Sequence, residues 1–418
     1  KNLFLSDRYV RGECPFCSAK NQYGDNCESC SQTYSATELI NPVSVLSETK
    51  PEIRTSEHFF FKLSLLQKEA KQWLKEANIQ PEVLNKLSEW VNGKLKDWDI
   101  SREAPYFGFE IPQYKGKYFY VWLDAPIGYL ASHQNYLDRI KRSDDFSKYW
   151  DKNSTTELYH FIGKDIIYFH TLFFPAMLLK SGFKQPSGVF VHGFLTVNGQ
   201  KMSKSRGTFI LVRTYLDLLN PEYIRYFLAT KLGNGVNDID LNLEDFLRRV
   251  NSDVVGKFIN IASRTSRFIN KDFKNCLSTT LHNPDLVDQF RVKASVVEDY
   301  LEEREFNKAM REVMILADKA NQYLDKMEPW ILIKDRKNKK LVHSICTTSM
   351  NLFRILSIML SPVLPDLAAN IYDFLKIKDQ KWKDINNPLL NQEIKPYKQL
   401  ITRIEEEHIQ ALIKNSKD

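Results

Sequence analysis

The clearest chemical signal in the sequence is a pair of lysines in a short polar loop. Residues 201–205 read Lys-Met-Ser-Lys-Ser and follow a turn-like Asn-Gly pair. Such a loop can place the ammonium groups of Lys201 and Lys204, with the hydroxyl of Ser203, on the oxygens of a polyphosphate. Met202 can anchor the loop against apolar surface. Cations held in this way stabilise the charge that builds on a departing pyrophosphate.

Other interpretations of this loop are open on the pattern alone. The G-x-x-x-x-G-K spacing of a Walker loop is missing, so the loop is not of that type. A solvated Lys/Ser loop is common on protein surfaces, and the charge pattern by itself favours that ordinary role. The other motifs of the sequence decide between a phosphate-binding loop and an ordinary surface loop.

Four cysteines lie within residues 14–30 in the pattern C-x₂-C-x₉-C-x₂-C. Two such turns can hold one Zn²⁺ tetrahedrally, and because protein fills all four positions the site is structural and not catalytic. The predicted ligands are Cys14, Cys17, Cys27 and Cys30. Two disulfides in a small secreted module are the alternative. The absence of a secretory signal and the remote Cys276 and Cys346 favour a reducing, cytoplasmic compartment.

Two apolar stripes indicate a pocket for an unbranched apolar side chain. One turns a strand-to-helix corner, and the other has the i, i+3, i+4, i+7 spacing of one helix face. Their members are Trp122, Ala125, Pro126 and Tyr129, and Ile166, Phe169, His170 and Phe173. Aromatic edges interact well with a thioether. The alternative is that both stripes belong to the core, with His170 as a hydrogen-bonded core imidazole.

The elements that must position these residues alternate between strand and helix. Aromatic and β-branched runs predict buried strands at residues 117–123, 157–162 and 188–197, with helices over 56–97, from Ile127 onward and after Asp165. This order is typical of a parallel α/β sheet, where ligands collect at the carboxyl ends of the strands. Gly163 and Asp165 lie at one such end. His192-Gly193 lies on the strand that leads into the lysine loop; there a glycine either admits a ligand or simply kinks the strand.

The strands are predicted to stop near residue 215, and a helical bundle follows. Amphipathic segments lie at 243–270, 285–327 and 340–361; Pro329 ends the second, and Pro362 and Pro365 end the third. One helix carries a stripe of Lys257, Asn260, Arg264 and Arg267, which can lie on phosphates and read a base edge. Trp330 can stack on an unpaired base. A solvated charged face and a core tryptophan are the alternatives.

Length and composition agree with a folded protein of two or three domains. The chain has 418 residues, 43% of them hydrophobic, and a net charge of +7, which permits an acidic polymer as partner without requiring one. The longest apolar stretch, residues 169–179, is far short of the roughly 20 residues of a membrane span. We therefore expect no membrane partner.

Taken together, these residues resemble the methionyl-tRNA synthetases of class I, in the bacterial type with a single four-cysteine knuckle. Residues 201–205 match the family's KMSKS signature in full, and the resemblance spans nearly the whole chain. The other matching stretches are 22–27, 98–102, 104–108, 120–129, 159–165, 192–193 and 238–245.

The resemblance implies a fold and a four-part organisation. The fold is α/β followed by all-α: a partial Rossmann-like parallel sheet with a zinc-knuckle insertion, then an α-helical anticodon-binding bundle. Residues 1–45 would be the zinc knuckle of the connective insertion and 46–215 the second half of the catalytic domain. Residues 216–240 would be a connecting stem segment and 241–418 the anticodon-binding domain.

The resemblance also implies a reaction and its residues. Methionine would be activated by ATP, with Mg²⁺, to methionyl-adenylate and then transferred to tRNA(Met) in translation. The methionine pocket would be lined by Trp122, Ala125, Pro126, Tyr129, Ile166, Phe169 and His170. ATP would be bound by Gly163, Asp165, His192, Gly193, Lys201, Ser203 and Lys204, with Lys201 and Lys204 acting in catalysis. The CAU anticodon would be read by Asn260, Arg264 and Trp330, and one structural Zn²⁺ would be held by the four cysteines.

The sequence departs from the family pattern in three places. The HIGH-type histidine motif and the early methionine-binding residues are not found, so we expect the chain to be a fragment that does not activate methionine alone. Phe174 stands where a close relative has Trp, which removes an N–H donor beside the pocket. The carboxyl-terminal tRNA-binding module that dimerises some members is missing, so no oligomeric state is inferred.

Three alternatives stay open. A sister synthetase for Ile, Val, Leu or Cys shares the loop signature, although 170 residues between Cys30 and Lys201 leave no room for the large editing insertion of the aliphatic enzymes. A zinc-containing tRNA-binding module without catalysis is the second. A scaffold protein that uses the helical bundle for protein contacts is the third.

Overall fold

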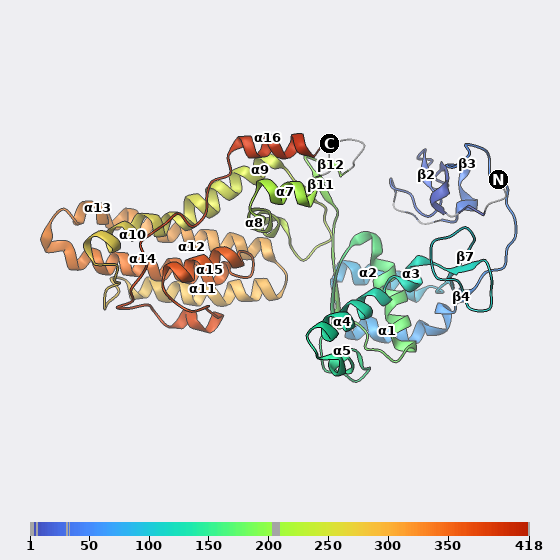
Figure 1. Ribbon diagram of the computed structural model, residues 1–418, viewed down its shortest axis with the longest axis horizontal. Coiled ribbons are helices and arrows are strands. Elements are labelled where there is room, and N and C mark those ends of the chain that lie inside the picture. Colours follow the sequence, from blue (N-terminus) through green and yellow to red (C-terminus); the bar gives the residue numbers. More distant parts are fainter. Residues whose placement is uncertain (1–3, 6, 31, 33, 203–209, 417–418) are drawn as a thin grey trace. The chain divides into compact units, whose positions relative to one another are not determined.

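The structure is a computed structural model that describes residues 4–5, 7–30, 32, 34–202 and 210–416 (Figure 1). The chain forms two compact units. The first contains residues Lys1–His160 and Asp165–Phe190, and the second contains Phe161–Lys164 and Val191–Asp418. Within the described ranges, no helix is both long and apolar enough to cross a membrane. The predicted four-part division, with boundaries at 45, 215 and 240, stays a prediction.

The first unit begins with a small antiparallel sheet in the order β2-β1-β3. Its strands and short 3₁₀ turns are β1 (Val10–Glu13), β2 (Gln22–Tyr23), β3 (Ile40–Ser44), η1 (Asp7–Tyr9) and η2 (Ala36–Glu38). Among its described residues, the buried apolar core consists of Val10, Cys14, Cys27, Tyr34 and Leu39. A core this small cannot stabilise a lobe by apolar burial alone, so the cysteines must contribute by another means.

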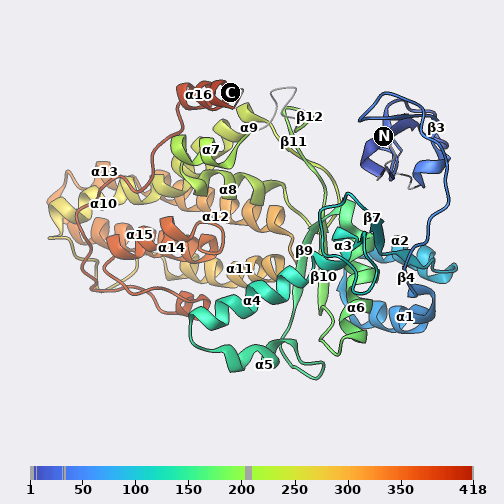
Figure 2. The same ribbon diagram turned by 45° about the vertical axis from the view of Figure 1, so that its right-hand side comes forward.

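A three-stranded sheet in the order β5-β10-β9 follows along the chain; Figure 2 labels β9 and β10, whose last residues belong to the second unit. The strands are β5 (Asn78–Ile79), β9 (Tyr159–Gly163) and β10 (Gly188–His192), with β5 and β10 parallel. The helices are α1 (Gln67–Glu76), α2 (Pro81–Asn92), α3 (Val121–Asp124), α4 (Ile127–Arg139), α5 (Phe146–Trp150) and α6 (Phe174–Lys180). Short turns are η3 (Leu63–Leu66), η4 (Ser143–Asp145), η5 (Lys164–Ile166) and the π-helix η6 (Phe169–Phe173). Two ribbons complete it: β4 (Phe60–Phe61) with β6 (Trp98–Asp99), and β7 (Ser101–Glu103) with β8 (Lys117–Phe119).

The predicted strand over 117–123 is wrong beyond residue 119. β8 pairs in register with β7 as far as Phe119, which opposes Ser101, and its Tyr118 also forms an antiparallel bridge to Glu110. Past this point the chain has no ladder partner beyond one bond from the Tyr120 N–H to Ile100 O, at 2.8 Å, so it turns into the helix α3. Trp122 therefore lies on a helix and is 37% exposed instead of buried in a strand.

A π-helix replaces the regular helix predicted after Asp165. The Phe174 N–H donates to Phe169 O, an i to i+5 bond, and the rings of these residues stack at 6.3 Å with an 11° interplanar angle. Phe173, which the i, i+3, i+4, i+7 spacing placed on the same face, instead packs on Trp98 at 3.9 Å. Because the π-turn is wider than a regular helical turn, Phe174 takes the place beside Phe169 that the regular spacing predicted for Phe173.

The second unit contains a sheet and a helical bundle. The sheet has the order β12-β11-β13, with β11 (Leu195–Val197) antiparallel to β12 (Gln200–Lys201) and parallel to β13 (Ile239–Leu241). The prediction that strands stop near residue 215 is therefore wrong, because β13 adds a short strand next to β11. The predicted strand over 188–197 is also divided, because β10 ends at His192 and β11 begins at Leu195.

The helices of this unit confirm the predicted bundle (Figure 1). They are α7 (Val212–Leu218), α8 (Pro221–Lys231), α9 (Leu243–Arg249), the π-helix η8 (Val250–Ile259), α10 (Asn260–Asp272), α11 (Pro284–Glu302), α12 (Phe306–Met327), α13 (Pro329–Leu332), α14 (Lys339–Leu360), α15 (Pro365–Phe374) and α16 (Glu406–Asn415), with 3₁₀ turns η9 (Arg336–Asn338) and η10 (Trp382–Asn386). The segment predicted at 285–327 is two helices, because Arg304 takes a left-handed conformation, φ 62°, that ends α11.

The centre of the bundle is α14, whose residues from 344 to 360 are all buried. Arg354 on this helix is only 2% exposed. Its guanidinium donates to Gln380 Oε1 at 2.9 Å, to Asn387 O at 2.8 Å and to Asp384 O. A buried cation is tolerated only when its donors are satisfied, so these bonds hold the irregular segment 376–390 against the bundle.

Candidate functional site

The four predicted cysteines form one cluster, which confirms their predicted proximity. All four Sγ atoms lie within 4.8 Å of one another. Cys14 Sγ is 3.7 Å from Cys30 Sγ, and Cys17 Sγ is 3.5 Å from Cys27 Sγ. Four thiolates at the usual ~2.3 Å from one tetrahedral Zn²⁺ have edges of about 3.8 Å, while a disulfide needs about 2.05 Å. The geometry fits a metal ion and excludes the two-disulfide alternative.

Backbone donors prepare this cluster for anionic sulfur. The Cys27 Sγ accepts the N–H groups of Ser29 at 3.3 Å and Cys30 at 3.4 Å, and Cys14 Sγ accepts the N–H of Phe16 at 3.4 Å. Burial acts to raise the pKa of the Cys27 thiol, but the N–H donors of Cys30 and Ser29 outweigh it and lower this pKa to about 7. These N–H donors therefore favour the thiolate of Cys27, the form that binds metal. Within the described ranges, this is the only close group of three or more metal-ligating side chains.

Four of the predicted methionine-binding residues form an aromatic cluster. The rings of Trp122 and Phe169 lie 5.1 Å apart, and those of Phe169 and His170 also lie 5.1 Å apart. Tyr129 Oη is 3.1 Å from His170 Nε2. His170 Nδ1 lies 3.2 Å from Ile166 O, so this contact assigns the proton to Nδ1 and leaves Nε2 to accept from the tyrosine hydroxyl.

The other predicted members are Ala125, Pro126 and Ile166, and the last two contact the cluster through their backbone carbonyl groups. Ala125 is exposed and Pro126 buried at the junction of α3 and α4, where the Tyr129 N–H donates to Pro126 O at 3.1 Å. Ile166 is partly buried and supplies the carbonyl that orients His170. The junction thus brings α4 and the π-helix together and leaves Trp122 and Tyr129 accessible.

A second histidine, which the sequence prediction missed, belongs to this cluster. The ring of His160 on β9 lies 5.5 Å from those of His170, Tyr129 and Phe174. Its Nε2 is buried without a hydrogen-bond partner among the described residues. Burial, helped by His170, lowers the pKa of His160 to about 4, and burial also lowers the pKa of His170. Both rings are therefore neutral near pH 7.

The signal for His160 was present in the sequence. Alternation along β9 buries His160 and Ile162 and exposes Tyr159 and Phe161 side chains. A histidine in the buried phase of a strand that ends at a predicted ligand edge is a candidate site residue. Trp98 was not predicted as a site residue, although its ring centroid lies 3.9 Å from that of Phe173 and 6.1 Å from that of Phe169.

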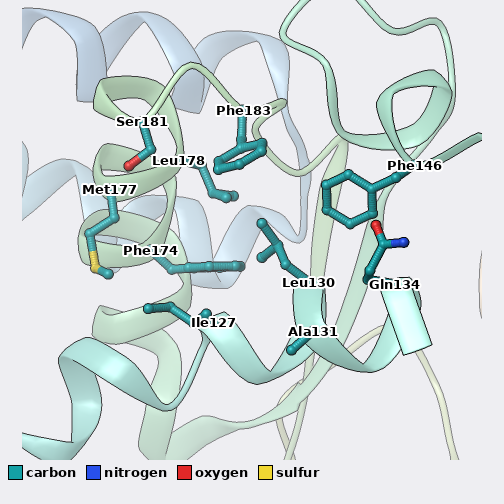
Figure 3. Close-up of a pocket in the computed structure, with 10 residues that line it drawn as sticks. All are labelled: Ile127, Leu130, Ala131, Gln134, Phe146, Phe174, Met177, Leu178, Ser181 and Phe183. Carbon is teal, nitrogen blue, oxygen red and sulfur yellow. The ribbon is translucent and has the colours of Figure 1, made fainter. Parts of the chain in front are cut away.

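An apolar pocket of about 390 Å³ lies between α4 and α6 (Figure 3). Figure 3 shows side chains of the two helices facing one another across the space, with Phe174 among them. Its lining is Ile127, Leu130, Ala131, Gln134, Phe146, Phe174, Met177, Leu178, Ser181 and Phe183. None of the predicted methionine-binding residues is in this set. The ring of Phe174 contacts Tyr129 at 5.7 Å on one side and lines the pocket on the other.

The predicted ATP-binding residues that the structure describes lie at or beside strand ends, as expected for this fold. Gly163 ends β9, and Asp165 is exposed in η5. The His192 side chain is exposed, with Nδ1 2.7 Å from Gly193 O. A Cβ on Gly193 would lie 2.1 Å from Asn237 O, so a glycine is required there by the close approach of the segment before β13.

The segment around β13 also ties the strand ends together. Asp238 Oδ1 accepts the Phe194 N–H at 2.7 Å and pairs with Lys164 Nζ at 2.7 Å. Hydrogen bonding from Lys164 and then from the Phe194 N–H lowers the pKa of Asp238. One carboxylate thereby holds the Lys164 side chain, just after β9, and the backbone N–H of Phe194, just before β11.

The base of the lysine loop is a hairpin held by a second carboxylate. Asp240 Oδ1 accepts the Gly199 N–H and the Thr196 hydroxyl, each at 2.7 Å. On the other side of the turn, Asn198 Oδ1 accepts the Leu243 N–H at 3.1 Å. These hydrogen bonds thus fix the direction in which the β11–β12 hairpin extends from β13. The sequence prediction missed Asp240 because the contact spans 41 residues.

Only the first part of the lysine loop lies in the described chain. Lys201 ends β12, and Met202 packs against the core of the second unit, which confirms its predicted anchoring. Ser203 and Lys204 lie outside the described residues.

The predicted anticodon residues come together on neighbouring helices. The guanidinium of Arg264 on α10 lies 4.7 Å from the ring centroid of Trp330 on α13 and pairs with Asp325. Asn260 Nδ2 donates to Asn321 Oδ1 at 3.3 Å. The side chains of Asn260, Arg264 and Trp330 are partly buried, whereas Arg267 of the same stripe is exposed. A cation over an aromatic ring presents a flat face on which a base can stack.

Comparison with known proteins places this arrangement in a family. Residues 1–266 match the family model described as tRNA synthetases class I (M), and residues 277–412 match the anticodon binding domain of methionyl tRNA ligase. A structure of Mycobacterium tuberculosis methionyl-tRNA synthetase in complex with methionyl-adenylate is 25% identical, with a TM-score of 0.74, over 88% of this chain and 74% of that chain.

Two further structures of the same mycobacterial enzyme share the fold. The apo form is 23% identical with a TM-score of 0.73 over 91% of this chain and 77% of that chain. The other methionyl-adenylate complex is 24% identical with a TM-score of 0.73 over 91% and 74%. The predicted α/β catalytic part and helical anticodon part are confirmed. The chain belongs to the methionyl-tRNA synthetases of class I and is a methionine–tRNA ligase.

Proposed function

We propose that the aromatic cluster of the first unit is the methionine site of this ligase. The observation that carries the proposal is the contact of Trp122, Phe169 and the Tyr129–His170 pair at one accessible face. Ring edges suit the polarisable thioether of methionine, which is unbranched and fits where a β-branched side chain does not. A neutral His170, oriented by Tyr129 and Ile166 O, keeps the wall free of charge. Ala125 and Pro126 would shape the adjacent corner.

The proposed reaction has two steps. A methionine carboxylate oxygen attacks the α-phosphorus of ATP, and the bond to pyrophosphate breaks to give methionyl-adenylate. A hydroxyl of the terminal adenosine of the tRNA then attacks the methionyl carbonyl, and AMP leaves. Gly163, Asp165, His192 and Gly193 would face the adenosine and ribose of ATP.

The lysine loop would act on the phosphates in the first step. Lys201 and Lys204 place positive charge on the β and γ oxygens, and Ser203 adds a hydroxyl donor. These contacts strengthen as charge moves onto the leaving pyrophosphate, so they stabilise the transition state more than the ground state. Mg²⁺ would enter as the counter-ion of ATP and neutralise part of the same charge.

The cysteine cluster would hold one structural Zn²⁺. Cys14, Cys17, Cys27 and Cys30 occupy all four positions, so the ion stabilises the lobe and takes no part in the reaction. None of the six cysteines is in a disulfide, which supports a reducing compartment, and we assign the protein to the cytoplasm.

The helical unit would bind tRNA(Met) and read its CAU anticodon. Trp330 would stack on an unpaired base, with Arg264 held over the ring by its pair with Asp325. Asn260 presents an amide, which has both donors and an acceptor for a base edge.

Amino-acid-dependent exchange of pyrophosphate into ATP tests the proposal on the protein in its natural length. We expect exchange with methionine and none above background with isoleucine or cysteine. Phe169→Ala should raise the KM for methionine at least tenfold and leave the KM for ATP within a factor of two. Its matched control is Phe146→Ala, which removes an equal ring from the α4–α6 pocket. Activation of cysteine or isoleucine in preference to methionine would reject the assignment.

A further inference from the structure

A second surface pocket lies on α10, close to the predicted anticodon residues. Its volume is about 430 Å³, and it lies wholly within the second unit. Its lining is Ser263, Ser266, Arg267, Asn270, Lys271 and Tyr397. Every lining residue is polar or carries a polar group, and none is acidic.

The pocket carries two positive charges that nothing compensates. Arg267 and Lys271 are four residues apart on α10, so their exposed side chains lie one helical turn apart on the same face. Among the described residues, neither makes an ion pair. Lys257 and Arg264, which belong to the same stripe as Arg267, pair with Asp318 and Asp325. Like charges at this spacing destabilise a helix, so a bound anion would relieve a cost that the free protein bears.

The wall of the pocket contains a buried polar atom without a partner. Ser266 is 0% exposed, and its Oγ makes no hydrogen bond in the described structure. Its neighbour Ser263 is satisfied, because its Oγ donates to Asn260 O at 3.1 Å. An unpaired buried hydroxyl is costly unless a ligand supplies its partner.

The opposite wall is fixed to the helix by one amide. Asn270 Oδ1 accepts the Tyr397 N–H at 3.1 Å, and its Nδ2 donates to Asn275 Oδ1 at 2.9 Å and to Lys395 O at 3.3 Å. The Tyr397 ring stands edge-on to Phe374 at 5.6 Å. The pocket is therefore preformed, which lowers the entropic cost of binding.

We propose that this pocket binds a phosphate group of the tRNA backbone beside the anticodon. The inference rests on the proposed function, in which the helical unit binds tRNA through Asn260, Arg264 and Trp330. Arg267 follows Arg264 by three residues, about 4.5 Å along the helix axis, so the pocket adjoins the base-reading side chains. Guanidinium, ammonium and hydroxyl groups are the donors that bind phosphate in nucleic-acid complexes. The phosphate positions the anticodon loop, and it carries no sequence information.

The test removes the two charges and measures tRNA affinity against salt concentration. For Arg267→Gln/Lys271→Gln in the protein of natural length, we expect the Kd for a tRNA(Met) transcript to rise about tenfold or more. The slope of log K against log salt should fall by roughly 0.7 to 1.4, since each lost phosphate contact in a single-stranded loop removes about 0.7. The loss should be equal for a transcript with an altered anticodon, whereas Arg264→Gln should lose affinity only for the CAU transcript.

The matched control is Lys340→Gln/Lys414→Gln, which removes two exposed lysines of α14 and α16. If this control loses as much affinity and slope, net charge explains the effect and the pocket assignment falls. An unchanged Kd in the Arg267/Lys271 variant, with normal tRNA binding by the parent, also overturns the inference while the proposed function stands. No tRNA binding by the parent would instead reject the proposed function.

Two further measurements distinguish the source of the phosphate and the part of Ser266. Inorganic phosphate at millimolar concentration should compete with tRNA in the parent and not in the double variant. Binding of inorganic phosphate to the pocket with no effect on tRNA would mean a free-phosphate site and overturn the proposal. Ser266→Ala should raise the Tm of the free protein and weaken tRNA binding, a combination that a purely structural hydroxyl does not give.

Discussion

At the scale of single residues, charge on the lysine loop is the feature closest to the chemistry. Lys204 lies outside the described part of the chain, but its role follows from its ammonium group and from the anchored Met202 two residues before it. A contact that exists mainly in the transition state changes the rate of adenylate formation and not the affinity for methionine.

Lys204→Ala should therefore slow adenylate formation about 100-fold, as expected for loss of roughly 3 kcal/mol of transition-state stabilisation. Single-turnover formation of methionyl-adenylate measures this rate, and equilibrium dialysis with labelled methionine measures affinity. The control Lys180→Ala removes a lysine at the end of α6 and should match the parent. A collapse of methionine affinity at an unchanged rate would show that the loop serves binding instead.

The neutral histidines of the aromatic cluster make folding sensitive to acid. Burial lowers the folded pKa of His160 to about 4, while a histidine in the unfolded chain titrates near 6.5. Below about pH 6.5 the unfolded chain takes up a proton that the folded chain refuses, so stability falls as the pH falls, until about pH 4.

Between pH 7 and pH 5, the free energy of unfolding of the parent should fall by about 2 kcal/mol more than that of His160→Gln. Urea unfolding followed through a probe in the first unit measures this difference. Comparing the two proteins at each pH removes contributions that they share, including loss of metal. Equal falls in the two proteins would place His160 in a solvated environment in the folded state.

At the scale of elements, the direction of the lysine loop depends on the hairpin of β11 and β12. The Asp240 carboxylate holds the Gly199 N–H and the Thr196 hydroxyl across the turn. Hydrogen bonds to a charged acceptor are worth about 1.5–3 kcal/mol each, so the carboxylate fixes the hairpin against the parallel strand β13.

Asp240→Ala should lower the rate of methionine-dependent pyrophosphate exchange about tenfold, equivalent to roughly 1.4 kcal/mol. The reason is that the hairpin would no longer fix the position at which the lysine loop begins. Asp240→Asn keeps an acceptor oxygen and should lose much less. Hydrogen exchange at the Gly199 amide should accelerate in Asp240→Ala alone. Slower pyrophosphate exchange in Asp240→Ala without faster hydrogen exchange at the Gly199 amide would indicate direct contact of Asp240 with ATP.

The elements also show what the sequence pattern could and could not predict. Long helices such as α14 were predicted because their apolar period extends over many residues, whereas the five-residue strand β9 was predicted from its aromatic and β-branched run. The π-turn at Phe169–Phe173 was missed, because an i to i+5 bond leaves no distinct residue pattern. β13 is only three residues long, and its pairing with β11 depends on a partner about 44 residues away. The cysteine spacing predicted its cluster because both knuckles are local.

At the scale of the whole molecule, the chain is two units with separate means of stabilisation. The second unit has a continuous core that includes α8, α12 and α14. In the described part of the cysteine lobe the buried core has five residues, and two of them, Cys14 and Cys27, are metal ligands in our proposal. Binding of the ion should therefore supply most of the folding free energy of that lobe and none of that of the bundle.

Removal of the ion by a strong chelator should unfold the lobe and leave the bundle intact. We expect one zinc per chain by elemental analysis, and after chelation we expect amides of residues 7–45 to lose hydrogen-exchange protection while those of α14 keep it. Cys17→Ser should reproduce the chelated state, and Cys276→Ser, which lies outside the cluster, should not. Protection that persists in residues 7–45 after the metal has left would mean that apolar burial by Val10, Tyr34 and Leu39 suffices, against the size of that core.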